Sequence, residues 1–224
     1  MKRTWLILVV VLGCSSSASA PEEYAEPQLA AVAANPEGVA YPTDSIGIVA
    51  RRTGRKGDRI PNFTFSGYPA SDRAGGLKTI ALANYYDPKA TRHRILHLVG
   101  VASWCPICRG EAEDLKKVQA ELPARGVVTL MVMLNGNTNG FGPSVDEVGT
   151  WMTRYDTRFD FGIDVRARKL GTMGVEGVPW NVLVDTRTME ILFAGAGAPS
   201  DVLAFVDAGL DVVKKIPPSY PLPE

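Results

Sequence analysis

The chain has 224 residues, of which 46% are hydrophobic and 21% charged, proportions typical of an ordinary globular protein. Its 24 Lys and Arg residues equal its 24 Asp and Glu residues, so no basic excess suggests a nucleic acid partner. This length suits one domain with extensions.

Residues 1–13 have the pattern of a bacterial lipoprotein signal peptide. Two basic residues precede the apolar run from Trp5 to Leu12, which is far shorter than the roughly 20 residues that a membrane-spanning helix needs. Val11-Leu12-Gly13-Cys14 resembles a lipobox, whose cysteine is acylated and becomes the first residue of the mature chain. We therefore expect a lipid on Cys14 and anchoring to the bacterial cell envelope, facing the periplasm or another extracytoplasmic space. Simple cleavage after Ala20 is the alternative.

Residues 14–56 are expected to form a flexible tether. Much of this stretch is Ser, Ala and Glu, and four prolines interrupt any long helix: Pro21, Pro27, Pro36 and Pro42. A short amphipathic helix over residues 24–34 is the alternative. The basic residues between 45 and 59 are interpreted as a solvated loop, with a membrane-headgroup patch as the alternative.

The first regular elements are expected to be strands over residues 60–65 and 77–83. A buried strand over 94–101, a helix over 105–122 and a buried strand over 127–134 then form a βαβ unit. Open α/β sheets place their chemistry beyond the carboxyl ends of their strands. The site is therefore expected where the strand over 94–101 meets the helix.

The next helix is expected to start at a capping-box pattern, Ser144 with Glu147, and to run to about Tyr155. The last helix is expected over residues 200–213, with Ser200 as its cap. The elements between them are a strand over 159–165, a short helix over 166–173, and a hairpin of strands over 180–184 and 189–194. We assign one domain to residues 57–213 and a proline-rich tail to residues 214–224.

Cys105 and Cys108 are expected to form a redox-active dithiol at the N-terminus of the βαβ helix. Unpaired N–H groups and the helix dipole favour a thiolate there, and the thiolate is the attacking species in disulfide exchange. Pro106 suits the first helical turn because its missing N–H has no partner there. With Cys14 acylated, these are the only thiols of the chain, and an extracytoplasmic location permits their disulfide.

Other uses of the cysteine pair fit less well. A zinc site needs two more ligands, and the chain offers only Cys14, His93 and His97 besides the pair. Covalent haem attachment needs a histidine where Arg109 stands. A structural disulfide between residues three apart closes too small a loop to stabilise much. We therefore expect neither a metal nor a bound cofactor.

The order of elements, with Trp-Cys-Pro-Ile-Cys at the first strand–helix junction, resembles the thioredoxin fold. Over about residues 57–213 the chain is similar to the TlpA/ResA-like thiol–disulfide oxidoreductases of bacterial envelopes. Ala102–Cys108 matches the active-site block of that family, Gly174–Pro179 the block before its cis-proline, and residues 144–173 its inserted helix and strand. The resemblance implies an α/β protein of thioredoxin-like fold, with a central mixed sheet flanked by helices, an N-terminal strand extension and an inserted helix and strand.

The resemblance also implies catalytic roles. Cys105 corresponds to the nucleophile and Cys108 to the resolving thiol. Glu111, three residues after Cys108, matches a glutamate that tunes the pKa values of the dithiol. The alternative for Glu111 is a solvated first-turn carboxylate that merely suits the helix dipole.

Substrate-binding residues follow from the same resemblance. Pro179 is implied to be cis and to face the cysteines. The backbone of Val178 is implied to pair with an extended substrate strand, and Trp104 adjoins the nucleophile. An ordinary trans proline that opens an edge strand is the alternative for Pro179.

Three residues depart from the family pattern. Thioredoxins keep a buried acid where this chain has Val99, so proton transfer falls to Glu111, a water or the other thiol. His97, two residues earlier on the same strand face, is expected to be a hydrogen-bonded core histidine, with a proton shuttle as the alternative. Trp180 stands after the proline, where smaller residues are usual, and either narrows the substrate groove or packs.

We therefore predict a membrane-anchored thiol–disulfide oxidoreductase that reduces or exchanges disulfides of extracytoplasmic proteins. A reducing role is favoured because Pro-Ile lacks the histidine of strong oxidants. The expected partners are protein dithiols or disulfides, a membrane thiol-electron carrier, and the membrane surface through Cys14. The alternatives are a peroxiredoxin-like thiol peroxidase, a Cu(I) metallochaperone and a binding domain without catalysis.

Overall fold

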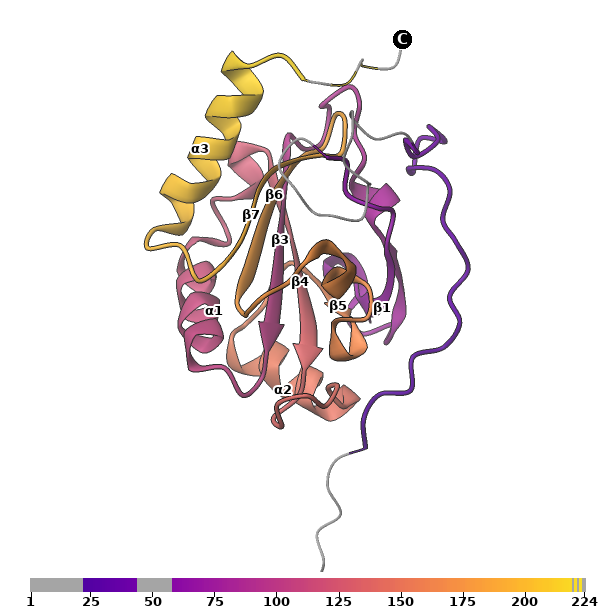
Figure 1. Cartoon of the computed structure of the whole chain (residues 1–224), viewed down its shortest axis with the longest axis vertical. Helices are drawn as coiled ribbons and strands as arrows, with labels where there is room; N and C mark the ends of the chain where they lie inside the picture. The colour runs from indigo at the N-terminus through magenta and orange to yellow at the C-terminus, as the bar shows by residue number, and fades with distance from the viewer. Residues whose placement is uncertain (1–21, 44–57, 219, 221, 223–224) are drawn as a thin grey trace, which may run out of the picture.

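The computed structural model describes residues 22–43, 58–218, 220 and 222 (Figure 1). The predicted signal peptide and the predicted lipidation site, Cys14, lie outside these residues. The main body is a seven-stranded sheet in the order β2-β1-β5-β4-β3-β6-β7. Its strands are β1 (Thr64–Tyr68), β2 (Lys78–Ala81), β3 (Ile95–Ala102), β4 (Val127–Asn135), β5 (Asp160–Ile163), β6 (Trp180–Asp185) and β7 (Glu190–Ala196). Its helices are α1 (Pro106–Val118), α2 (Val145–Arg154) and α3 (Val202–Lys215).

The strand β3 lies inside the sheet, and all eight of its residues are buried. It pairs parallel with β4 and antiparallel with β6, so the sheet is mixed, as predicted. The unit β3–α1–β4 is the predicted βαβ unit. The N-terminal strands β1 and β2 extend the sheet through the antiparallel pairing of β1 with β5. The inserted pair α2 and β5 is also present where the sequence predicts it.

One face of the sheet is covered by the helices. Successive side chains of a strand point to opposite faces, so Ile95, His97, Val99 and Val101 share the helix-covered face. Their apolar members pack into one buried cluster with residues of α1, α2 and α3. Figure 1 shows α1 and α3 beside each other at this flank of the sheet. This face therefore carries both the cysteine helix and the buried polar groups described below.

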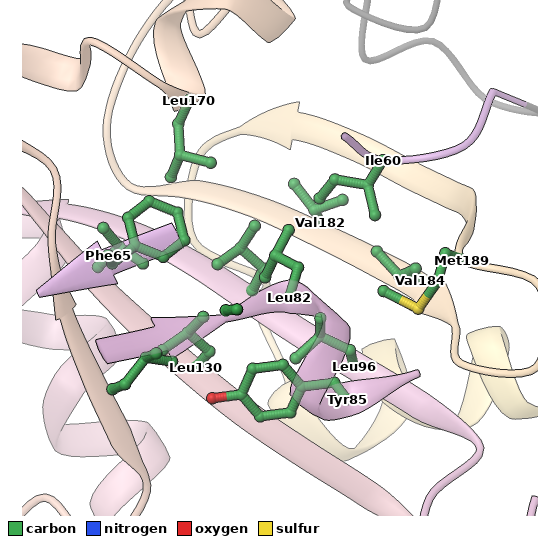
Figure 2. Close-up of a cluster of buried hydrophobic side chains, with 14 of the residues drawn as sticks. Ile60, Phe65, Leu82, Tyr85, Leu96, Leu130, Leu170, Val182, Val184 and Met189 are labelled. Atoms are coloured by element: carbon green, nitrogen blue, oxygen red, sulfur yellow. The ribbon is translucent and has the colours of Figure 1, made fainter. Parts of the chain in front are cut away.

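The opposite face has a separate buried cluster that includes two short 3-10 turns rather than long helices. Figure 2 shows part of it, in which side chains of the sheet meet Leu82 and Leu170 from those turns. Tyr85 comes from the same turn as Leu82, and the other labelled members are Ile60, Phe65, Leu96, Leu130, Val182, Val184 and Met189. Two cores therefore fix the sheet from both sides.

The middle of the expected tether contacts the domain. The backbone N–H of Tyr24 donates to the Pro143 carbonyl at 2.8 Å, and Asn62 donates to the Val32 carbonyl at 2.6 Å. Asn35 is buried and donates to the carbonyl of Tyr86 at 3.0 Å. Residues 22–43 contain no helix, so the alternative of a helix over residues 24–34 is wrong. Figure 1 shows this segment as an extended chain along one edge of the molecule.

Several element ends differ from the sequence-based expectation. The strand β1 begins at Thr64 instead of residue 60, because Ile60 bonds instead to the Met189 carbonyl at 2.9 Å. The helix α1 ends at Val118 instead of residue 122, since a turn and Pro123 follow it.

The caps of the other two helices give one success and one correction. The capping box of Ser144 and Glu147 at α2 is confirmed in both directions. The predicted cap of α3, Ser200, is wrong: Asp201 caps the helix through a bond from the Ala204 backbone N–H at 2.9 Å. A carboxylate at this position also suits the positive end of the helix dipole.

Candidate active site

The cysteine pair lies where the buried strand β3 gives way to α1. Cys105 is the N-cap of α1, and its Sγ atom accepts a hydrogen bond from the backbone N–H of Cys108 at 3.2 Å. Pro106 occupies the first helical turn, as predicted. The N-cap sulfur thus satisfies one of the N–H groups that a helix start leaves unpaired.

Both sulfurs are free thiols and both residues are buried. Cys105 is 3% exposed and Cys108 is fully enclosed, whereas Ile107 between them is 58% exposed. Burial raises the pKa of the Cys108 thiol far above its ordinary value, and its hydrogen bond with Cys105 raises it further. Cys108 is therefore held as a neutral thiol behind Cys105.

The loop before β6 lies against the first cysteine. The peptide bond between Val178 and Pro179 is cis, so that prediction is confirmed. The Cys105 thiol donates to the carbonyl oxygen of Val178 at a sulfur–oxygen distance of 3.6 Å. The Pro179 carbonyl accepts from the Gly197 backbone N–H at 2.7 Å, which ties this loop to the end of β7.

The two tryptophans of the region have different places. Trp104, just before the pair, is half-buried, and its Nε1–H has no hydrogen-bond partner within the described residues. Trp180 is 3% exposed and packs in the cluster on the sheet face opposite the helices. Of the two roles considered for Trp180, the structure supports packing.

Glu111 lies on the buried face of α1, one turn after Cys108. It is 2% exposed, so the alternative of a solvated carboxylate is wrong. Neither carboxyl oxygen has a hydrogen-bond partner within the described part of the chain. Burial raises the pKa of Glu111 to about 7, the Asn181 amide lowers it, and the charge of Asp114 raises it. A carboxyl group with this pKa can both hold and release a proton near neutral pH.

His97 is a hydrogen-bonded core histidine, as predicted. It is fully buried, and its Nε2 lies 2.7 Å from Oδ1 of Asn181. Its ring also meets the Phe205 ring edge-on, with the centroids 5.6 Å apart. Burial lowers the pKa of His97 to about 4, so the imidazole is neutral at pH 7.

Sequence reasoning missed Asn181, which bonds His97 and whose amide lowers the pKa of Glu111. The only available signal was a carboxamide at the start of an otherwise apolar strand core, Val182–Val184. Because the interaction joins β3, β6 and α1, no local pattern contains it. Within the described residues, no group of three or more His, Cys, Asp or Glu side chains is placed to hold a metal ion.

Comparison with known protein families identifies the family to which this chain belongs. A sequence profile described as Redoxin matches residues 55–188. The chain belongs to the Redoxin family. The prediction of a thioredoxin-like oxidoreductase is thereby confirmed. No curated protein sequence gives a match to this Redoxin chain.

Solved structures share the fold of this Redoxin protein. One is a candidate thiol:disulfide interchange protein DsbE from Chlorobium tepidum, with 22% identity, a TM-score of 0.55, and coverage of 71% of this chain and 98% of that one. A secreted thiol-disulfide isomerase from Corynebacterium glutamicum has 15% identity, a TM-score of 0.54, and coverage of 70% and 87%. The thioredoxin domain of a thiol-disulfide oxidoreductase from Bacteroides vulgatus has 14% identity, a TM-score of 0.53, and coverage of 69% and 97%. At these identities the likeness establishes the thioredoxin-like fold, which confirms the predicted fold class.

Proposed function

We propose that this Redoxin protein is a membrane-anchored thiol–disulfide oxidoreductase that reduces or exchanges disulfides in extracytoplasmic proteins. The observation that carries the proposal is the position of the Cys105 sulfur. It caps α1 above the buried Cys108 and lies against the Val178 carbonyl before the cis-proline.

The reaction proceeds by two exchanges at sulfur. The Cys105 thiolate attacks one sulfur of a substrate disulfide, forms a mixed disulfide and releases the other substrate sulfur as a thiolate. Cys108 then loses its proton and attacks the Cys105 sulfur, which releases the second substrate thiolate. The substrate gains two electrons, and the enzyme is left with a Cys105–Cys108 disulfide. A partner dithiol must return it to the reduced state, and no bound cofactor is needed.

Glu111 is the proposed acceptor of the Cys108 proton. Cys108 is a weak acid in this buried site, so it needs a base before it can attack. Glu111 is the acid one turn further along the same helix, and its raised pKa of about 7 lets it take up that proton. This role replaces that of the acid that thioredoxins carry where this chain has the apolar Val99.

Substrate docking is proposed on the surface around Cys105. In this proposal the backbone of Val178 pairs with an extended substrate segment as an added strand. The exposed side chain of Ile107 and the half-buried Trp104 provide apolar contact beside the nucleophile. These contacts suit a protein chain better than a small molecule.

The proposed location is the bacterial envelope, with a lipid on Cys14 and a membrane thiol-electron carrier as reductant. The lipobox-like sequence before Cys14 supports the anchor. The Corynebacterium neighbour is described as secreted, which agrees with an extracytoplasmic place for this fold. In the part of the chain that the structure describes, no helix has the length and apolarity needed to cross a membrane.

Reduction of insulin by dithiothreitol, followed by turbidity, tests the function. We expect the parent protein to accelerate the reaction and Cys105→Ala to abolish the acceleration. Thr188→Val serves as a matched control, because it also changes one buried side chain but lies in the turn between β6 and β7, away from the cysteine end of the sheet. Equal activity of the parent and Cys105→Ala contradicts the proposal.

The peroxidase alternative is separated by stopped-flow measurement of hydrogen peroxide consumption. Peroxide turnover usually needs an arginine at the reactive sulfur. Here the Arg109 guanidinium donates two hydrogen bonds to the Ser103 carbonyl, at 3.1 and 2.8 Å. We therefore expect slow peroxide consumption compared with insulin reduction.

A further inference from the structure

Asn181 is a buried carboxamide whose hydrogen-bonding capacity is only partly used. It lies at the start of β6 and is 1% exposed. Its Nδ2 donates to the carbonyl oxygen of Gly197 at 3.0 Å, and its Oδ1 lies 2.7 Å from His97 Nε2. An amide nitrogen carries two hydrogens. One of them bonds the Gly197 carbonyl, which leaves the other for a further acceptor.

The neighbours fix the orientation of this amide. The Gly197 carbonyl can only accept, so the Asn181 nitrogen must face it and the Asn181 oxygen must face His97. His97 therefore carries its proton on Nε2 and donates it to Asn181. Its Nδ1 is buried without a partner among the described residues, which agrees with a neutral ring protonated on Nε2 alone.

Glu111 lacks hydrogen-bond donors, which the Asn181 amide can supply. Both of its carboxyl oxygens are buried and lack hydrogen-bond partners within the described chain. Asn181 is the pairing partner of Val99, whose side chain packs with residues of α1 in one buried cluster, so its amide lies on the sheet face that α1 covers. The Asn181 amide also lowers the pKa of Glu111. A second amide hydrogen and two unpaired carboxyl oxygens therefore lie between the same face of the sheet and the same helix.

The cavity beside Asn181 offers no substitute donor. It lines a cavity of about 410 Å³ between β7 and α3. The other side chains of that lining are apolar and include Leu183, Leu192, Phe193 and Phe205. Loss of the Asn181 amide thus removes the polar side chain of this lining and leaves no replacement for it on the cavity side.

We propose that Asn181 is the positioning residue for Glu111, and that His97 holds its amide so that one hydrogen remains for the carboxylate. This inference rests on the proposed role of Glu111 as acceptor of the Cys108 proton. It adds a three-residue unit, His97–Asn181–Glu111, that controls when that acceptor is ionised. Where thioredoxins have a single buried acid, this chain has Val99 and instead uses Glu111 together with two residues that orient it.

The charged and titratable groups around Glu111 are few. On its own helix and cap they are Cys105, Cys108 and Asp114, and on β3 the group is His97. The acids of the other packed elements are paired elsewhere: Asp185 of β6 with Arg187, and Asp207 of α3 with Arg125. Since His97 is neutral at pH 7, removing it deletes no charge beside Glu111.

The test is an NMR titration of the Glu111 carboxyl carbon in protein labelled with ¹³C-glutamate. We expect a midpoint near pH 7 in the parent and a rise of about one pH unit in Asn181→Leu, because the ionised form loses the stabilising influence of the Asn181 amide. His97→Leu should raise the midpoint in the same direction. His97→Gln should restore the parent value, because its amide can still donate to Asn181. The control Thr188→Val should leave the midpoint unchanged.

The titration tests the role of Asn181, and a separate activity measurement tests the role of Glu111, so the two proposals can fail independently. An unchanged midpoint in Asn181→Leu overturns the inference. If that variant does not fold, Asn181→Val and His97→Leu carry the same test, and an unchanged midpoint in either overturns it equally. Insulin reduction by Glu111→Gln is measured independently. If that variant keeps the parental rate and pH profile, Glu111 is not the proton acceptor, whatever Asn181 does to its titration.

Discussion

The Cys105 sulfur and the Val178 carbonyl oxygen lie 3.6 Å apart, across the gap between the cysteine helix and the proline loop. Two residues separated by more than seventy positions in the chain thus lie side by side at the candidate active site. A substrate strand that pairs with the Val178 backbone brings its own disulfide to the same sulfur. Substrate docking and disulfide exchange therefore occur at the same place, because the Val178 residue that pairs with the substrate also contacts the Cys105 sulfur.

The first prediction concerns the order of the two thiols. In Cys108→Ala, Cys105 can still attack a substrate disulfide, but nothing resolves the product. We expect a mixed disulfide between Cys105 and a disulfide-containing test protein to accumulate. It should appear as an extra band on a non-reducing gel, and treatment with dithiothreitol should remove that band. Cys105→Ala is the matched control and should trap nothing. Trapping through Cys108 in that control would reverse the assigned roles.

The second prediction uses the raised pKa of Glu111. The unfolded chain releases this proton near the ordinary glutamate pKa of 4.5, whereas the folded protein, with a pKa of about 7, holds it until about pH 7. Between these values the native state binds more protons, so the contribution of Glu111 to stability falls as the pH rises. The fall amounts to about 3 kcal/mol across this window.

The measurement is urea denaturation of the parent and Glu111→Gln at pH 4 and pH 8. The glutamine cannot ionise, so the variant should gain about 3 kcal/mol in free energy of unfolding relative to the parent between the two pH values. Taking the difference between the two proteins removes the contributions of the other carboxyl groups. A difference that is the same at both pH values would show that Glu111 titrates normally.

The third prediction concerns recognition of protein substrates by Ile107. This side chain is 58% exposed beside the nucleophile, and Ile216 after α3 is exposed to the same fraction. We expect Ile107→Asp to lower kcat/KM for insulin about fivefold, since it removes apolar contact area at the docking surface. Ile216→Asp should have no effect. Reduction of a small aromatic disulfide should be similar in both variants, and an equal loss with that substrate would point to altered cysteine chemistry instead.

The fourth prediction concerns the anchor. Expressed in a Gram-negative host, the parent should incorporate labelled palmitate and sediment with membranes, because acyl chains on Cys14 partition into lipid. Cys14→Ala should lose the label and appear in the soluble envelope fraction. Mass spectrometry of the mature protein decides between the two processing sites. A mature chain that begins at Pro21 contradicts lipidation.

Local sequence patterns were sufficient for much of the fold. The apolar run of β3 followed by Cys-Pro-Ile-Cys predicts a strand, a cap and a helix, because each feature depends only on neighbouring residues. The capping box at Ser144 was found for the same reason. The cap of α3 was missed by one position, since Ser200 and Asp201 are both good caps and sequence alone does not choose between them.

Features that depend on tertiary packing were not accessible in this way. The burial of Glu111 is decided by where α1 rests on the sheet, and the helix pattern alone left its exposure open. The link from His97 through Asn181 joins three elements, and its partner could not be named from one strand. The contacts of residues 22–43 also form with distant surfaces, such as the carbonyls of Tyr86 and Pro143, so composition alone suggested only a tether.

Those contacts limit how far the domain can stand from a lipid bilayer. If Cys14 carries the lipid, only residues 14–21 separate it from the docked segment, and eight residues reach at most about 28 Å. The docked segment starts at the same pole of the molecule as the carboxyl ends of β3 and β4 (Figure 1). A connection this short holds the end of the sheet that carries Cys105 close to the lipid headgroups. A membrane protein that donates electrons can then reach Cys105 without a rotation of the whole domain.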